Sequence, residues 1–363
     1  MDKKYKICFF SGDISRNGGT ERVATQIANG LNERGHEVFF LSYSGGNTSH
    51  YFLDNNIKLY SLGLENASGF FSRKLSPYKR LTKFLKEKET DIIVDIDVLL
   101  SLYTLPIKSV TGVKVISWEH FNLLENKVKT RVLARRLATL FSDCIVTLNK
   151  SDRENYLNIT PRKNRKNIRY IYNPAVSHSN IKTNLENKQV IAVGRLTYQK
   201  NFERLLKLWK ETEKRNDDWK LIIVGEGEGK STLDNLILEN NINNVSILGF
   251  RDDIETLYER SSIMVMTSRF EGLPMVLLEG QKKGLPIVAF DCPTGPAEIV
   301  VNDKNGYLID YNNDRDFINK LDGLMNNQRK LKEFSDNAIN DADRFNLDTI
   351  IDKWVELVNS LFK

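Results

Sequence analysis

The chain has 363 residues, of which 40% are hydrophobic and 10% are aromatic. One hydrophobic core rarely serves a chain of this length, so the composition predicts two globular domains. No apolar run approaches the ~20 residues that cross a bilayer. The first run, Tyr5 to Phe10, is too short for the apolar region of a signal peptide. We therefore expect a cytoplasmic protein without a membrane span.

The cysteines and histidines argue against both disulfides and a metal site. Cys8, Cys144 and Cys292 are widely spaced and odd in number, which is typical of packed thiols in a reducing compartment. No two cysteines have the C-x-x-C spacing of a zinc site, and the chain has only 4 histidines. The sequence predicts no bound metal.

The net charge of +6 hides an asymmetry between the two halves of the chain. Residues 1–172 hold 28 Lys and Arg against 17 Asp and Glu, whereas residues 173–363 hold 25 against 30. A basic first half indicates an anionic partner on that side. Because the sequence has no nucleic-acid-binding motif, we favour an anionic membrane surface or a phosphate-linked acceptor.

The first half opens with a strand, a glycine pair and a helix. Tyr5 to Phe10 is an apolar run, Gly18 and Gly19 follow it, and helical spacing continues to about Leu31. A glycine pair before a helix lets the backbone approach a phosphate, which the positive helix end also favours. A simple turn explains the same pair equally well.

A basic amphipathic segment lies further along, from Phe70 to Lys88, and carries seven Lys or Arg residues among apolar ones. Such a segment can lie on an acidic membrane surface. We favour a surface helix whose apolar side faces the domain core. Basic residues recur from Lys127 to Arg136 and from Arg162 to Arg169, which keeps the membrane interpretation open.

The remaining strands of this half are expected at Glu37–Ser42, Asp91–Leu99, Val115–Trp118 and, as the last one, Cys144–Leu148. Ser151 is the expected cap of the next helix. His120 comes just past a strand's carboxyl end, where ligands bind to parallel sheets. A purely structural histidine is the alternative. Glu119 either orients His120 or meets an acceptor.

The pattern restarts at Tyr172 to Pro174, which we take as the domain boundary. Val190 to Arg195 is an expected strand, which ends in Arg195, and the loop after it, Leu196 to Asn201, carries Lys200. An Arg fork can grip phosphate oxygens, and a Lys adds a mobile point charge. The run from Gly225 to Gly229, G-E-G-E-G, does not match the dinucleotide motif G-x-G-x-x-G, because its third glycine comes one position too early. We expect a turn that lines a nucleotide pocket, with Gly225 close to the ligand.

Two carboxylates dominate the central stretch. The run from Ile263 to Met266 reads as a buried strand, and helical spacing begins at Met275. Glu271 therefore lies in a strand-to-helix loop, beside a helix end that favours an anion. Glu279 follows about two turns later. This pattern favours a ligand with both phosphates and hydroxyls, such as a sugar nucleotide.

The segment from Glu271 to Glu279, E-G-L-P-M-V-L-L-E, resembles the E-x7-E signature of retaining glycosyltransferases of family 4, which have the GT-B architecture. The segment from Gly194 to Asn201, G-R-L-T-Y-Q-K-N, is similar to the family's phosphate clamp. The run F-D-C-P-T-G-P-A-E-I, which begins at Phe290, looks like members that build bacterial surface polysaccharides.

The resemblance implies an α/β fold of two Rossmann-like domains, with parallel sheets that face a central cleft. Residues 1–172 would form the acceptor-side domain, and the terminal helix at 346–363 would pack back on it. Residues 173–345 would bind the nucleotide sugar. Asp95-Ile96-Asp97 matches the D-x-D tripeptide with which a different glycosyltransferase architecture holds a metal. We interpret this match as chance.

The resemblance also implies roles for individual residues. Glu271 would bind donor-sugar hydroxyls or support the oxocarbenium-like centre, His120 would face the sugar, and Arg195 and Lys200 would hold the diphosphate. Further contacts to the nucleotide sugar are expected from glycine, loop and helix positions, namely Gly18, Gly19, Gly194, Gly225, Phe250, Arg251, Gly272, Leu273, Pro274, Met275 and Glu279. A UDP-sugar would be the donor, without metal or other cofactor.

The implied function is a retaining transfer of a hexose or N-acetylhexosamine to a glycan or lipid-linked oligosaccharide, beside the inner face of the cell membrane. A protein or a teichoic-acid-like polymer is the alternative acceptor, and a non-catalytic sugar-nucleotide-binding subunit is the alternative class. A phosphorylase would need a pyridoxal cofactor, for which the sequence has no lysine signature. The motifs of nucleotide-sugar epimerases differ from those seen here.

Overall fold

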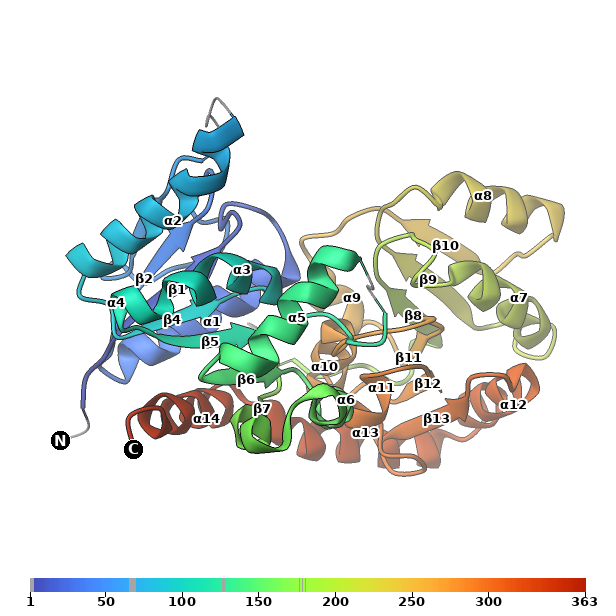
Figure 1. Cartoon of the computed structure of the whole chain (residues 1–363). Helices are drawn as coiled ribbons and strands as arrows, with labels where there is room; N and C mark the ends of the chain where they lie inside the picture. Colours follow the sequence, from blue (N-terminus) through green and yellow to red (C-terminus); the bar gives the residue numbers. More distant parts are fainter. Residues whose placement is uncertain (1–2, 65–69, 126–127, 176, 178, 180) are drawn as a thin grey trace. The chain divides into compact units, whose positions relative to one another are not determined.

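The computed structural model describes residues 3–64, 70–125, 128–175, 177, 179 and 181–363 (Figure 1). The chain divides into two compact units, Met1–Asn173 with Leu347–Lys363, and Pro174–Asn346. The boundary expected after residue 172 and the return expected at residue 346 both fall next to this division. Among the described residues, no helix combines the length and the apolar character that crossing a membrane requires.

The first unit is built on a parallel sheet of seven strands in the order β3-β2-β1-β4-β5-β6-β7. The strands are β1 (Lys6–Ser11), β2 (Glu37–Ser42), β3 (Lys58–Ser61), β4 (Ile92–Asp95), β5 (Lys114–Trp118), β6 (Cys144–Thr147) and β7 (Ile168–Tyr170). The helices are α1 (Gly19–Glu33), α2 (Phe70–Glu87), α3 (Ser101–Thr104), α4 (Lys108–Thr111), α5 (Lys129–Phe141), α6 (Lys150–Ile159) and α14 (Leu347–Ser360), with 3-10 turns η1 (Val98–Leu100), η2 (Leu105–Ile107) and η3 (Arg162–Asn167).

The structure corrects four expectations in this unit. The strand expected at Asp91–Leu99 ends at Asp95, because the Asp97 side chain accepts the Leu99 N–H at 2.8 Å and begins η1. Cys144–Leu148 is not the last strand, since β7 lies beyond it. The edge strand β3 was also not expected. Asn149, rather than Ser151, caps α6 by accepting the Asp152 N–H at 2.6 Å.

Helix α2 behaves as a surface helix, as expected. Leu81 and Leu85 are buried in the hydrophobic core beneath the sheet, and Phe84 packs against the same cluster. The apolar side of α2 from Leu81 onward is therefore occupied by its own domain, whereas Leu75 is 56% exposed. The side chains of residues 70–74, which include two of the aromatic residues in the membrane interpretation, lie outside the described part of the chain.

The terminal helix α14 packs within the first unit. Ile351 contacts α1 at Gly30, where a Cβ atom would lie 2.3 Å from the Ile351 Cδ1 atom. Trp354 meets Trp118 of β5 edge-on, with ring centroids 4.8 Å apart. Hence the last residues of the chain help to build the unit that the first residues begin.

The second unit has a parallel sheet of six strands in the order β10-β9-β8-β11-β12-β13. The strands are β8 (Gln189–Val193), β9 (Lys220–Val224), β10 (Val245–Leu248), β11 (Ile263–Met266), β12 (Ile287–Asp291) and β13 (Gly306–Asp310). The helices are α7 (Phe202–Glu213), α8 (Lys230–Glu239), α9 (Ile254–Glu259), α10 (Met275–Lys282), α11 (Pro296–Ile299), α12 (Asp314–Met325) and α13 (Gln328–Ala342), followed by the turn η4 (Asp343–Phe345).

The topology indicates where each unit would bind a ligand. In the second unit the strand order reverses between β8 and β11, and in the first unit it reverses between β1 and β4. Open parallel sheets bind ligands outside the carboxyl ends of the strands at such a reversal. The loops after β8 and β11 therefore border the favoured site of the second unit. These two Rossmann-like sheets confirm the expected α/β architecture.

Candidate active site

The loops after β8 and β11 are joined into one structure by hydrogen bonds. The Arg269 N–H donates to the Gln199 carbonyl oxygen at 2.8 Å, and the Gln199 Nε2 atom donates to the Phe270 carbonyl oxygen at 3.0 Å. The Thr267 hydroxyl donates to the Lys200 carbonyl oxygen at 3.3 Å. Residues that are some 70 positions apart in the sequence thus share one site edge.

Glu271 lies at the centre of this edge. The residue is 6% exposed, and its Oε1 atom accepts a hydrogen bond from the Lys200 Nζ atom at 2.7 Å. The Gln199 Nε2 atom approaches its other oxygen, Oε2, at 3.3 Å. The structure brings Glu271 and Lys200 into direct contact. Gln199 is a second partner of the carboxylate, and no role was predicted for it although it belongs to the same sequence motif.

Helix α10 starts just beyond Glu271 and carries Glu279. Pro274 precedes its first turn and has no side chain that could cap it. The positive end of the helix therefore lies beside the Glu271 loop. On the same helix, the Glu279 Oε2 atom accepts a hydrogen bond from the hydroxyl of the buried Tyr258 at 3.0 Å. Gly272 and Leu273 complete the connection between β11 and α10.

The two predicted glycines of this unit allow its loops to touch. Gly225 has a φ of +147°, and a Cβ atom there would lie 2.0 Å from the Gly194 carbonyl oxygen. A Cβ atom on Gly194 would lie 2.8 Å from the Lys200 Cε atom. Close packing between loops thus accounts for both glycines. Beside them the Arg195 side chain is exposed and makes no ion pair within the described residues, so it is available to an anion.

The predicted nucleobase region lies on the loop after β10. Phe250 is 59% exposed, and its N–H donates to the Glu226 Oε1 atom at 3.2 Å. Arg251 is paired with Asp253 through two hydrogen bonds of 2.7 and 2.8 Å. The Arg251 side chain is therefore already engaged, which leaves the backbone and the exposed Phe250 ring for a ligand.

In the first unit the predicted glycine pair lies at the amino end of α1. Gly18 is the N-cap residue in an extended conformation, and Gly19 begins the helix. Glu21 lies in the first turn, with its carboxylate so close that a Cβ atom on Gly18 would be 2.3 Å from the Glu21 Oε2 atom. Burial raises the pKa of Glu21. An anion at this helix end would therefore have an acidic neighbour.

His120 directly follows β5, and its environment keeps it neutral. Its ring packs on Trp118 with centroids 4.4 Å apart, and its Nε2 atom is buried without a hydrogen-bond partner in the described part of the chain. Burial lowers the pKa of His120 to about 4, while the nearby Asp97 raises it and Arg131 lowers it further. A neutral imidazole can exchange hydrogen bonds with sugar hydroxyls.

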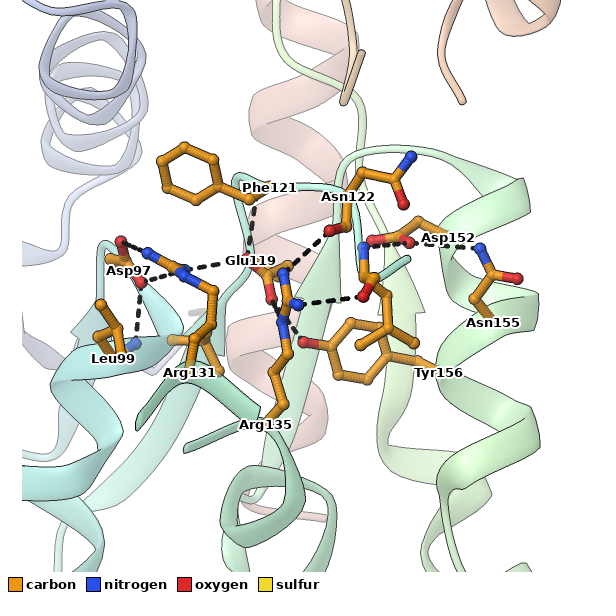
Figure 2. A network of polar contacts seen from close by, with 12 residues as sticks. Asp97, Leu99, Glu119, Phe121, Asn122, Arg131, Arg135, Asp152, Asn155 and Tyr156 are labelled. Atoms are coloured by element: carbon orange, nitrogen blue, oxygen red, sulfur yellow. Dashed lines mark hydrogen bonds and ion pairs between the residues drawn. The ribbon is translucent and has the colours of Figure 1, made fainter. Parts of the chain in front are cut away.

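Glu119 and Asp97 face inward, towards side chains of their own unit (Figure 2). The Glu119 carboxylate accepts hydrogen bonds from Arg135 Nε and from the Tyr156 hydroxyl, both at 2.6 Å. Asp97 forms a bidentate pair with Arg131 at 2.8 and 2.9 Å. Within the residues described, no cluster of three or more His, Cys, Asp or Glu side chains could hold a metal.

Two parallel-sheet units, with a carboxylate and cations gathered at the carboxyl edge of the second, define a glycosyltransferase of the GT-B architecture. Family models for "Glycosyltransferase Family 4" and "Glycosyl transferases group 1" match residues 17–175 and 176–341, respectively. The chain belongs to glycosyltransferase family 4.

Proteins of similar sequence support this assignment over nearly the whole length of the chain. An uncharacterized glycosyltransferase of Haemophilus influenzae is 34% identical over 96% of this chain and 98% of its own. The amylovoran biosynthesis glycosyltransferase AmsD of Erwinia amylovora is 31% identical over 98% of this chain and all of its own. An α-1,4-N-acetyl-D-galactosaminyltransferase of Campylobacter jejuni, named for an undecaprenol-diphosphate-linked acceptor, is 26% identical over 97% and 98%.

Solved structures agree on the fold. The lipopolysaccharide outer core galactosyltransferase WaaB has a TM-score of 0.79 at 23% identity, covering 98% of this chain and 99% of WaaB. HepE of Anabaena in complex with UDP-glucose has a TM-score of 0.79 at 18% identity, covering 98% and 100%. These likenesses confirm the GT-B architecture.

Proposed function

We propose that this glycosyltransferase transfers a hexose or N-acetylhexosamine from a UDP-sugar, with retention at the anomeric carbon, in the synthesis of a bacterial surface polysaccharide. The main support for this proposal is the Glu271 carboxylate, which Lys200 and Gln199 hold beside the amino end of α10. One carboxylate, one ammonium group and one helix end together suit the hydroxyls and the diphosphate of a sugar nucleotide.

In the proposed reaction the bond between the anomeric carbon and the diphosphate breaks while the acceptor oxygen bonds to the same face of the sugar. The departing diphosphate takes up the proton that the acceptor hydroxyl loses. Arg195, Lys200 and the amino end of α10 stabilise the charge that develops on the diphosphate. Glu271 binds donor-sugar hydroxyls next to the cationic centre, and Glu279 binds the ribose. Positioning and electrostatics then suffice without a metal.

Neutral His120 would face the donor sugar from the first unit, and Gly18 and Gly19 would lie near the diphosphate. Gly225, Phe250 and Arg251 would contribute backbone contacts to the nucleotide, together with the connection from Gly272 to Met275. Because the carboxylate of Glu21 lies next to Gly18, the charge on the diphosphate is stabilised mainly by residues of the second unit.

The names of similar proteins support the donor and the acceptor. HepE has been crystallised with UDP-glucose, and the pneumococcal O-GlcNAc transferase GtfA with UDP and GlcNAc. The Campylobacter relative is named for a lipid-linked oligosaccharide acceptor. A poly(ribitol-phosphate) α-N-acetylglucosaminyltransferase of Staphylococcus aureus, 29% identical over 60% of this chain, keeps a teichoic-acid-like acceptor as the alternative.

We also propose that the enzyme contacts the anionic inner face of the cell membrane through the outer side of α5 and the turn η3. This outer side carries exposed Leu133, Arg136 and Leu140. The Asn164 Nδ2 atom donates to the carbonyl oxygens of Thr139 and Leu140, so η3 lies beside the end of α5. Exposed basic residues of η3 border the apolar side chains, namely Arg162, Lys163, Arg165 and Lys166. This mixture suits an anionic lipid surface.

The test of the proposed donor is release of UDP from a panel of UDP-sugars, with and without EDTA. We expect slow hydrolysis of one donor, unchanged by EDTA, and a loss of roughly 100-fold or more in Glu271→Ala and Lys200→Ala. Lys214→Ala is the matched control, because Lys214 is exposed at the carboxyl end of α7 and forms an ion pair with the neighbouring Glu211. If the protein binds no UDP-sugar, the donor assignment is wrong.

A further inference from the structure

The proposed reaction leaves unexplained a buried group of charges around Glu119 (Figure 2), the residue that precedes His120 in the chain. Glu119 is 1% exposed, and both of its carboxylate oxygens point to donors of its own unit. Oε2 receives Arg135 Nε and the Tyr156 hydroxyl, each at 2.6 Å. Oε1 receives the Phe121 N–H at 3.1 Å and lies 3.5 Å from the Arg131 guanidinium.

The same side chains hold the backbone of the segment after β5. Residues 119–124 form neither helix nor strand, so their peptide groups need other partners. Arg135 donates to the carbonyl oxygens of Asn122 and Leu123 at 3.0 and 3.1 Å. Asp152 accepts the Leu123 N–H at 3.0 Å. Thus α5 and α6 fix this segment through two charged side chains.

The sequence left two roles open for Glu119, which were to orient His120 or to contact an acceptor. The direction of its side chain favours the first role. A carboxylate that met an acceptor would have to leave Arg135, Tyr156 and the Phe121 N–H, and would leave a buried guanidinium without its anion. A buried ion pair of this kind adds little stability over packed apolar side chains, and its best-supported use is to specify one conformation. The conformation specified here is that of the segment containing His120.

We propose that Glu119 is a positioning residue: with Arg135 and Tyr156 it fixes residues 119–124 so that the half-buried ring of His120 is presented to the donor sugar. The proposal rests on the proposed function only for the statement that the sugar meets His120. The placement of the ring by Glu119 stands on the contacts alone. The charged groups that face the ring are Asp97, from the loop after β4, and Arg131, from α5.

The test follows the His120 ring by NMR titration of histidine-labelled full-length protein, with the signal assigned from a His120→Gln variant. In wild type the ring should stay neutral from pH 5 to 8. In Glu119→Gln, which keeps the shape but loses the charge, solvent should reach the ring. Its pKa should then rise by at least about one unit towards the ordinary value near 6.5. Tyr156→Phe removes one hydrogen bond, and we expect a smaller shift in the same direction.

The control is Asp143→Asn, at the other end of β5. Asp143 also accepts a backbone N–H, that of Val115, and pairs with two cations, Lys108 and Lys114. Its loss should lower the melting temperature by an amount similar to that for Glu119→Gln without moving the His120 signal. If Glu119→Gln does not fold, Tyr156→Phe carries the test.

Donor turnover supplies a second, separate readout. With the donor identified, kcat should fall about 10- to 100-fold in Glu119→Gln while the donor KM stays near that of wild type. Asp143→Asn should keep the wild-type kcat. A His120 signal that is the same in Glu119→Gln, Tyr156→Phe and Asp143→Asn would overturn the proposal. An enzyme that turns over no UDP-sugar would contradict the proposed function instead, since the NMR result does not depend on the donor.

Discussion

The donor-binding role proposed for Glu271 depends on the side chains that hold its carboxylate as much as on the charge of that carboxylate. Lys200 and Gln199 contact its two carboxylate oxygens at 2.7 and 3.3 Å, and Gln199 also donates to the Phe270 carbonyl oxygen. An ammonium group supplies charge, whereas an amide that bridges two loops supplies orientation. The two contacts should therefore respond differently to substitution.

Gln199→Ala should weaken donor binding about 10-fold, because one neutral hydrogen bond and the link between the loops are lost. Gln199→Glu should be more damaging, since it places a second carboxylate against Glu271. Calorimetric titration with the preferred UDP-sugar, or with UDP, measures both affinities. Gln26→Ala, on helix α1 of the first unit, is the control. Equal affinities for Gln199→Ala and Gln199→Glu would contradict this account.

Asp152 makes the stability of the first unit depend on pH. Burial raises the pKa of Asp152 to about 6 from an ordinary value of 3.8. A raised folded-state pKa means that the folded protein binds the proton more tightly than the unfolded chain does. The stability that this carboxyl group contributes is therefore present below pH 4 and is lost as the pH rises through 6.

Asp152→Asn should remove this dependence while keeping an oxygen for the Leu123 N–H. Relative to wild type, the variant should gain roughly 3 kcal/mol between pH 4 and pH 7, as expected for a shift of about two pKa units. Urea unfolding across that range measures the difference. A wild-type and variant difference that does not change with pH would show that the folded-state pKa of Asp152 is ordinary.

At the scale of elements, the contact between α1 and α14 shows how a glycine fixes the separation of two helices. A Cβ atom at Gly30 would lie 2.3 Å from the Ile351 Cδ1 atom, which is closer than atoms can approach. Arg34, which caps the carboxyl end of α1, also pairs with Asp352 of α14 at 2.7 Å, but this pair is partly exposed and contributes little. Packing at Gly30 therefore dominates the contact.

Gly30→Ala should destabilise the protein by about 1–2 kcal/mol, even though alanine favours helix more than glycine does, because Ile351 must shift. The double variant Gly30→Ala, Ile351→Ala should be more stable than the sum of the two single effects predicts, since the smaller side chain makes room. Thermal unfolding of the four proteins of this cycle measures the coupling. Strictly additive effects would mean that the two helices do not meet at this point.

Helix α5 has two charged sides with different uses. Its inner side presents Arg131 and Arg135, which are 5% and 2% exposed, to Asp97 and Glu119. Its outer side keeps Leu133, Arg136 and Leu140 exposed. A count of basic residues treats these groups alike, but only the outer group is available to an anionic partner.

At the scale of the whole molecule, the basic first unit predicts selective binding to anionic membranes. The protein should float with vesicles that contain phosphatidylglycerol and not with pure phosphatidylcholine, and added salt should weaken the binding. The double variant Leu133→Ser, Leu140→Ser should lose about 10-fold in affinity. Leu238→Ser is the matched control, because Leu238 is 74% exposed on α8 of the second unit. Equal binding of both variants would refute the proposed surface.

Much of the fold could be predicted because buried parallel strands are continuous apolar runs. β1, β2, β5, β6, β8 and β11 fall where the sequence predicted them, within one or two residues. The edge strands β3 and β7 were missed, since Lys58–Ser61 and Ile168–Tyr170 are short and only partly apolar. An edge strand is set by pairing with its one neighbour, which a local pattern does not record.

The sequence by itself also determined which residues gather at the carboxyl edge of the second sheet. Arg195 ends a predicted strand, Lys200 and Glu271 lie in the loops that follow predicted strands, and parallel strands bring such loops to one edge. What only the tertiary structure decided is which polar side chains face inward. Glu119 is buried because its partners Arg135 and Tyr156, which lie 16 and 37 positions further along the chain, pack around it. Charge and spacing are local properties of the chain, whereas the burial of a charge depends on the three-dimensional arrangement of everything that surrounds it.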